Sequence, residues 1–210
     1  MKVLDIATGG GHVAKQLAKH VNEVIATDLT KEMLENTAKH LKAYQNISYA
    51  VADAENLPFH DSMFDIITCR IAAHHFPNPE KFISEVKRVL KPDGQFLFID
   101  NIAPEDNALD QFNNTLEKMR DYSHVRSRLV SEWKKIFRDN DLTIMKEMTR
   151  KKTLPYKEWV RRTVDNQEKI NGITQYILNS SDEVQYYFQV KMENNDIQSF
   201  AIDEWMVLAK

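Results

Sequence analysis

The first hundred residues alternate between short apolar runs and amphipathic segments. Runs of strand length occupy residues 3–7, 23–28, 47–52, 64–69 and 95–99. Between them, apolar residues recur every three or four positions, as on one face of a helix. Asn78 and Pro79 mark a helix start, because Asn suits the N-cap and Pro the first helical position. Repeated strand–helix–strand units predict a parallel sheet with helices on both faces.

The pattern changes after residue 100. Residues 103–141 and 155–190 have helical spacing, whereas residues 142–148 and 200–208 are typical of strands. We therefore predict an α/β fold with a doubly wound, Rossmann-like sheet. We expect residues 1–210 to form a single domain in which the two helical segments make a lid or insertion.

Composition and charge limit the compartment and the binding partners that we expect for this domain. Cys69 is the only cysteine and cannot form an internal disulfide, and nothing near the N-terminus resembles a signal peptide, so we predict a cytoplasmic protein. No apolar run approaches the roughly 20 residues that span a bilayer, which argues against stable membrane insertion. The net charge of −3, with acids and bases interspersed, gives no broad electrostatic case for binding nucleic acid.

The first strand leads into a glycine turn that opens a helix. Gly9 and Gly11 permit positive φ and let a ligand approach the backbone. Asp28 and Asp53 end the next two strands, at the sheet edge where ligands bind in doubly wound folds. Asp28 has the spacing of an acid that binds ribose hydroxyls. However, Gly9-x-Gly11-x-x-Ala14 also fits the dinucleotide fingerprint, so an NAD(P)-dependent oxidoreductase is a rival interpretation, and a plain turn with solvated acids is a third.

Several further motifs together point to a known family. They are Val3-Leu4-Asp5 with the glycine loop, Ile25-Ala26-Thr27-Asp28-Leu29, Asp53-Ala54-Glu55-Asn56-Leu57-Pro58-Phe59, Phe64-Asp65, and Glu85-Val86-Lys87-Arg88-Val89-Leu90-Lys91-Pro92-Asp93-Gly94 with the strand after it. Over residues 3–145 the chain resembles the class I methyltransferases that depend on S-adenosylmethionine (SAM), type 11 group, similar to ubiquinone/menaquinone biosynthesis methyltransferases. The resemblance implies a seven-stranded sheet whose last strand runs antiparallel. It also implies SAM as cofactor and S-adenosylhomocysteine as product.

The same resemblance assigns the cofactor site. The residues that we predict to contact SAM are Asp5, Ala7, Gly9, Gly11, His12, Asp28, Leu29, Met33, Asp53, Ala54 and Arg70. Asp5 and the glycine loop would hold the methionine part, Asp28 the ribose, and Asp53 with Ala54 the adenine edge. Leu29 and Met33 would pack against the adenine. For Arg70 a plain surface role is equally open.

Two adjacent histidines follow the fourth strand, where this fold faces the methyl group. His75 and His74 are our catalytic candidates, and such a histidine can act as a general base, bind a metal or orient the substrate. Adjacent side chains diverge and no nearby Cys or Glu spacing completes a ligand set, so we predict no metal site. The segment lacks the Asn/Asp-Pro-Pro-aromatic motif of enzymes that methylate nucleic-acid bases, which argues against that substrate.

Three polar residues are candidates for contact with the substrate. Arg126 can pair with a carboxylate and His124 with a polar group, although a helix-capping turn is an equal alternative, and Asp100 ends the fifth strand at the same crevice. The predicted reaction is methyl transfer from SAM to a small molecule, and family analogy suggests a quinone-like acceptor. A SAM-binding protein without catalysis is the non-enzyme alternative. The sequence is also compatible with a homodimer.

The chain departs from the family pattern at two places. Ala7 stands where the family has its first loop glycine. The sequence also begins almost on its first strand, whereas family members usually carry helices before it that cover the cofactor. We therefore expect that these N-terminal cap helices are missing from the 210 residues.

Overall fold

A computed structural model describes residues 1–210, which divide into two compact units. The first unit comprises Met1–Asp100, Trp133–Met148 and Met206–Lys210, and the second comprises Asn101–Glu132 and Thr149–Trp205. The boundaries fall inside strands β5, β6 and β8 and inside helix α5 rather than in linkers. In chain order the elements are β1 (Lys2–Ile6), α1 (His12–Leu17), β2 (Glu23–Asp28), α2 (Lys31–His40), β3 (Ile47–Val51), β4 (Phe64–Arg70), the 3₁₀ turn η1 (Ala73–His75), α3 (Pro79–Val89), β5 (Leu90–Ile102), α4 (Asn107–Arg120), α5 (Val130–Asp139), β6 (Ile144–Pro155), α6 (Tyr156–Arg161), α7 (Gln167–Leu178), α8 (Asp182–Tyr187), β7 (Lys191–Glu193) and β8 (Asp196–Ala209).

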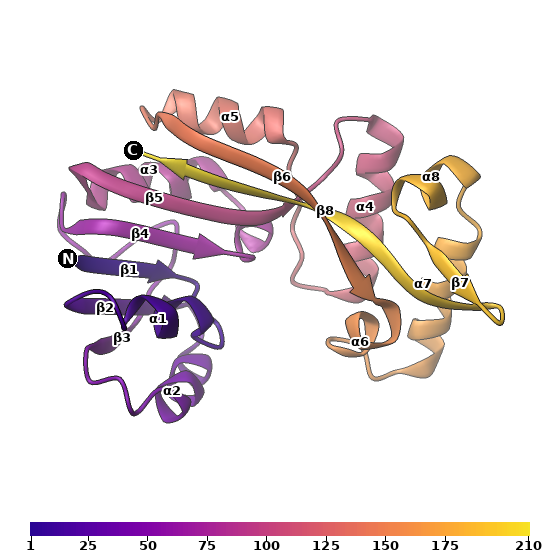
Figure 1. The fold of residues 1–210 in the computed structure, drawn as a ribbon, viewed down its shortest axis with the longest axis horizontal. Helices are drawn as coiled ribbons and strands as arrows, with labels where there is room; N and C mark the ends of the chain where they lie inside the picture. The colour runs from indigo at the N-terminus through magenta and orange to yellow at the C-terminus, as the bar shows by residue number, and fades with distance from the viewer. The chain divides into compact units, whose positions relative to one another are not determined.

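The strands pair in the order β3-β2-β1-β4-β5-β8-β6, and β7 adds to β8 (Figure 1). The pairs β1–β2, β1–β4, β2–β3 and β4–β5 are all parallel. The end of β8 runs antiparallel to the start of β6, because Thr143 and Lys210 exchange both backbone hydrogen bonds, at 2.8 and 3.0 Å. The structure therefore confirms the doubly wound, mostly parallel sheet with an antiparallel last strand. The short hairpin strand β7 brings the count to eight rather than the predicted seven.

Strand β5 begins earlier than the sequence pattern predicted. The predicted strand covers residues 95–99, but residues 91–94 also lie inside β5, which already pairs with β4 at Leu90. The pairing then skips from Phe64↔Leu90 to Ile66↔Gln95, so several residues of β5 bulge opposite one residue of β4. Pro92 lacks an N–H and cannot join a regular ladder, which accounts for the bulge at this place.

Apolar strands and aromatic helix residues build the core of the first unit. Val3 and Leu4 of β1 are fully buried, as expected for parallel strands that helices cover on both faces. Phe98 of β5 packs against Trp133 of α5, with ring centroids 4.8 Å apart. This packing fixes the strands, and with them the carboxyl ends of β1, β2 and β4.

Helices α4, α6, α7 and α8 surround the second unit's own core. Phe112 of α4 stacks on Tyr176 of α7, with ring centroids 5.0 Å apart and planes at 8°. The fully buried carboxylate of Glu204 accepts hydrogen bonds from Arg150 (Nε, 2.7 Å) and Lys152 (Nζ, 3.2 Å). A buried carboxylate is tolerated where it is paired in this way.

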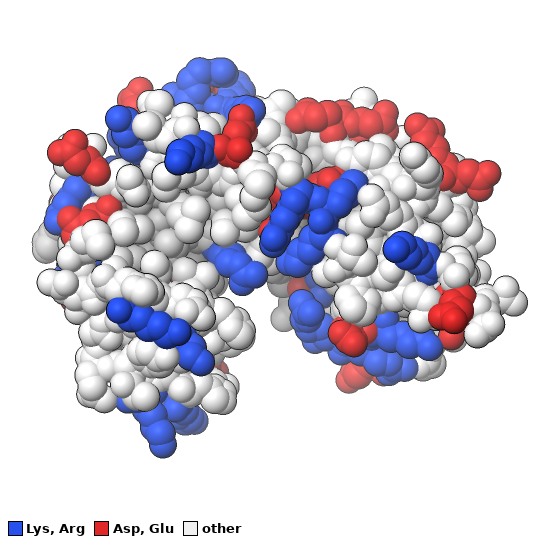
Figure 2. Space-filling view, viewed as in Figure 1, with Lys and Arg blue, Asp and Glu red and all other residues white.

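Charges of both signs are mixed on the surface. On the face in Figure 2, Lys and Arg side chains and Asp and Glu side chains occur on each unit. None of the helices is long and apolar enough to cross a membrane.

Candidate active site

Asp5 lies buried at the carboxyl end of β1. Its Oδ2 accepts a hydrogen bond from the Thr8 hydroxyl and its Oδ1 from the Thr68 hydroxyl, both at 2.6 Å. Burial raises the pKa of the Asp5 carboxyl, and the two hydroxyl hydrogen bonds oppose that rise. The side chain is therefore held in one orientation at the start of the glycine loop. The sequence analysis did not identify Thr8 or Thr68, although hydroxyl residues beside a candidate carboxylate are a usable signal.

The glycine loop has a left-handed backbone at three positions. The φ angles of Ala7, Gly9 and Gly11 are 52°, 51° and 73°. A Cβ on Gly11 would lie 2.5 Å from Thr37 Cγ2 and 2.6 Å from Leu41 Cδ1, so this glycine lets α2 pack against the loop. A Cβ on Gly9 would meet nothing within 4 Å. The backbone of Gly9 therefore borders open space, where a ligand can approach it.

Asp28 connects the end of β2 to this loop. Its Oδ2 accepts a hydrogen bond from the Gly9 N–H (3.1 Å) and its Oδ1 from the Thr30 N–H (3.2 Å). The carboxylate is only partly buried, so it retains accepting capacity toward a ligand. This geometry brings together two predicted cofactor residues that are 19 positions apart in the sequence.

A cavity of about 210 Å³ lies at these strand ends. The residues that line it are Asp5, Ala7, Thr8, Gly9, Gly10, His12, Val13, Arg70 and Ile71. Five of them, namely Asp5, Ala7, Gly9, His12 and Arg70, belong to the predicted cofactor set. Ile71 has a φ of 54°, which is an outlier for a β-branched residue and marks a strained wall at the end of β4.

The remaining predicted cofactor residues lie outside the lining of that cavity. Leu29 and Met33 are exposed apolar side chains, 71% and 44% accessible. Asp53 forms a local turn in which its Oδ1 accepts from the Glu55 N–H (2.8 Å), and the neighbouring Ala54 is buried. Gly11 is buried beneath α2 and acts through packing.

The two histidines follow β4 in the turn η1 and have different environments. His74 is buried; its backbone N–H donates to Asp100 Oδ2 (2.8 Å), and its ring Nδ1 lies 2.7 Å from Asp100 Oδ1. His75 is partly exposed, and its ring centroid lies 4.2 Å from that of His74. The Asp100 carboxylate therefore fixes the turn that carries His75. The roles of His74 and His75 in catalysis, and of Asp100 in substrate binding, stay predictions.

The nearby thiol of Cys69 is not a usable nucleophile. It is fully buried, and this burial raises the pKa of the thiol well above its ordinary value. Because the thiolate is the reactive form, Cys69 acts as a small core residue.

The other two predicted substrate residues belong to the second unit. His124 is buried, and its Nε2 donates to the Asn114 side-chain oxygen (2.9 Å). Arg126 donates from Nη2 to Asp110 (3.0 Å) and to Glu132 (3.3 Å). Both hold the segment after α4 in place, and their contact with a substrate stays a prediction.

Comparison with known proteins adds to this geometry. The methyltransferase domain family matches residues 4–98. YcgJ of Bacillus subtilis, an uncharacterized methyltransferase, is 40% identical over 196 residues, which are 92% of this chain and 78% of the relative. A candidate methyltransferase from Bacillus halodurans superimposes with a TM-score of 0.95 at 40% identity, over 99% of this chain and 91% of that one. The chain belongs to this methyltransferase family.

The assignment confirms the predicted resemblance and the prediction of an enzyme that uses SAM. It also decides against the nicotinamide oxidoreductase that the glycine pattern alone left open. A more distant relative, the ubiquinone/menaquinone biosynthesis C-methyltransferase UbiE of Rickettsia prowazekii, is 36% identical over 119 residues. These residues are 52% of this chain and 48% of that protein, so the match leaves the acceptor of this methyltransferase open.

Proposed function

We propose that this methyltransferase binds SAM in the cavity at the ends of β1, β2 and β4 and transfers its methyl group to a small molecule. The observation that carries the proposal is the pairing of the Asp28 carboxylate with the open backbone of Gly9. An acid beside a glycine loop is the arrangement with which this type of fold binds nucleoside ligands at the sheet edge.

The residues present fit the cofactor in three respects. The cavity contains the Asp5 carboxylate and a backbone that no side chain covers at Gly9, which suits the amino-acid part. The Asp28 carboxylate can accept hydrogen bonds from both ribose hydroxyls. The exposed apolar side chains of Leu29 and Met33 supply a surface for a flat adenine ring, and Asp53 with Ala54 supplies its polar edge.

The chemistry demands little of the side chains. When bound, SAM supplies an electrophilic methyl group on its sulfonium. The loop and the wall at Arg70 and Ile71 hold the reactants and exclude water, and such positioning contributes roughly 7–11 kcal/mol in the most favourable cases. We infer that His75, on the turn fixed by the His74–Asp100 contact, accepts a proton from the methyl acceptor at a ring nitrogen, an effect typically worth about 10²–10⁴-fold in rate.

We propose that the acceptor is a small molecule and that quinone-like compounds are the first class to try. The support is the partial likeness to UbiE, a C-methyltransferase of ubiquinone and menaquinone biosynthesis.

The experiment is transfer of a labelled methyl group from SAM to a panel of hydroquinones, phenols and small amines. Once an acceptor is found, His75→Ala should lower kcat at least about 100-fold and leave the SAM affinity within a few fold. His60→Ala is the matched control, because His60 is exposed and is not one of the residues lining the cavity. A large loss of SAM affinity in His75→Ala would refute the role of a base. Absence of transfer to every acceptor, with SAM bound, would support a binding protein without catalysis.

A further inference from the structure

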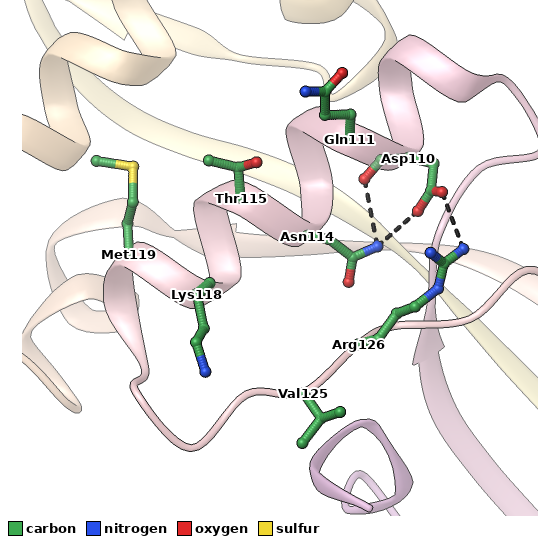
Figure 3. A pocket seen from close by; sticks show the side chains of 8 residues that line it. All are labelled: Asp110, Gln111, Asn114, Thr115, Lys118, Met119, Val125 and Arg126. Atoms are coloured by element: carbon green, nitrogen blue, oxygen red, sulfur yellow. Dashed lines mark hydrogen bonds and ion pairs between the residues drawn. The ribbon is translucent and has the colours of Figure 1, made fainter. Parts of the chain in front are cut away.

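A second and larger cavity, of about 650 Å³, lies in the second unit along α4 and the segment that follows it (Figure 3). Its lining residues are Asp110, Gln111, Asn114, Thr115, Lys118, Met119, Val125 and Arg126. The volume falls within the roughly 300–1,000 Å³ of small-molecule sites. Of these residues the sequence analysis singled out only Arg126 as a ligand contact.

The Asp110 carboxylate and the Asn114 amide oxygen of this wall already accept hydrogen bonds from the chain. Asp110 Oδ1 accepts from the Asn114 amide (2.6 Å), and Oδ2 accepts from Arg126 (3.0 Å). The side-chain oxygen of Asn114 accepts twice, from the Ser127 N–H (2.7 Å) and from His124 Nε2 (2.9 Å). Both oxygens of Asp110 and the side-chain oxygen of Asn114 therefore already have donors within the chain, and the guanidinium of Arg126 offsets the charge of Asp110.

Two cationic side chains of the wall keep N–H groups that the chain does not use. The buried Nε of Arg126 has no hydrogen-bond partner. The Lys118 ammonium donates to the carbonyl oxygens of Tyr122 (2.8 Å) and His124 (2.7 Å), which leaves its third N–H. The neighbouring carboxylates of Glu117 and Asp110 form their ion pairs with Arg120 and Arg126 rather than with Lys118. A wall of this kind is complementary to a ligand that brings acceptors and negative charge.

The other lining residues suit the rest of such a ligand. Met119 and Val125 give an apolar surface, and Val125 is 45% exposed. Gln111 and Thr115 lie on α4, as does Met119, and add neutral polar groups (Figure 3). The cavity thus combines a fixed cation with an apolar patch, which is the pattern of a site for an amphipathic small molecule.

We propose that this cavity binds a small organic anion, in which a carboxylate or phosphate group is attached to an apolar body. Lys118 is the main counter-charge, and Arg126, held by Asp110 and Glu132, is the second donor. The apolar body packs on Met119 and Val125. The inference goes beyond methyl transfer, because binding of the anion at this place requires neither the cofactor nor turnover.

The test is titration of the ¹⁵N-labelled 210-residue chain with benzoate, phenyl phosphate and neutral benzamide, followed by amide chemical shifts. Both anions should shift the amides of residues 110–126, and benzamide should bind at least about tenfold more weakly because it brings no charge for Lys118. Lys118→Gln should weaken binding of both anions by about tenfold or more. Lys169→Gln is the matched control, since Lys169 lies on α7 in the same unit, is exposed and is not one of the residues lining the cavity.

A second variant tests the proposal independently if Lys118→Gln fails to fold. Gln111→Trp fills the cavity from an exposed position and keeps both cations, so it should also abolish binding of the anions. Shifts confined to residues 7–13 would place the probe in the cofactor cavity and overturn the proposal. Equal affinity for benzoate and benzamide, or unchanged binding in both variants, would overturn it as well.

Discussion

The two glycines of the loop make a matched pair for testing how the site is built. Replacing either one with alanine puts a side chain into the left-handed region, at φ 51° for Gly9 and 73° for Gly11. That conformation costs an L-residue roughly 1–2 kcal/mol. Only at Gly11 does the new Cβ also collide, at 2.5 Å from Thr37 and 2.6 Å from Leu41. Overpacking of this kind costs typically about 1–3 kcal/mol.

Gly11→Ala should therefore lose about 2–5 kcal/mol of unfolding free energy, and Gly9→Ala only about 1–2 kcal/mol. The effects on ligand binding should be reversed, because the Cβ of Gly9→Ala points into open space at the cofactor cavity. Urea denaturation followed by tryptophan fluorescence measures the first effect, and calorimetric titration with S-adenosylhomocysteine measures the second. Equal destabilisation of the two variants would refute the packing role assigned to Gly11.

Three further predictions concern carboxylates of the first unit. Burial raises the pKa of the Asp5 carboxyl, so the contribution of Asp5 to the unfolding free energy falls as pH rises above the ordinary value of 3.8. Unfolding free energies measured from pH 3 to 7 should therefore show that Asp5→Asn becomes more stable relative to the wild type as pH rises. Glu85 is the opposite case, because hydrogen bonds from Arg88 and from the Leu57 N–H lower its pKa below the ordinary 4.5. That contribution is present above pH 4.5 and is lost as pH falls through the lowered pKa, so Glu85→Gln should flatten the acid limb of the stability curve. Asp100→Asn weakens the contact that fixes His74 and should lower kcat about tenfold while leaving KM for SAM unchanged; a proportional change in KM would indicate a general structural defect.

Much of the first unit could be predicted because its signals are local. Buried parallel strands such as β1 are continuous apolar runs, and the glycine loop and Asp28 stand at strand ends that must meet at one edge of the sheet. The Asp5 hydrogen bonds could not be predicted, since Thr68 reaches Asp5 from a strand 63 positions away. The same holds for the His74–Asp100 contact, which depends on the register of β4 against β5.

The second unit was less predictable for a related reason. Helical spacing indicated that α4 and α7 exist, but the cavity on α4 depends on how the segment after it folds back. That path is set by the side chains of Asn114 and Lys118, which hold it through backbone groups of residues 122–127. Hydrogen bonds to backbone atoms cannot be predicted from the pattern of hydrophobic residues.

The central claim is that the cavity beside Gly9 and Asp28 holds SAM. The most direct measurement is calorimetric titration of the purified chain and of its Asp28→Ala variant with SAM, S-adenosylhomocysteine, NAD and NADP in parallel. We predict that SAM and S-adenosylhomocysteine bind with micromolar affinity and that neither nicotinamide binds. Asp28→Ala should weaken the binding of SAM and of S-adenosylhomocysteine at least about tenfold, because the hydrogen bonds to ribose are lost. Binding of a nicotinamide alone, or full SAM affinity in the Asp28→Ala variant, would contradict the account.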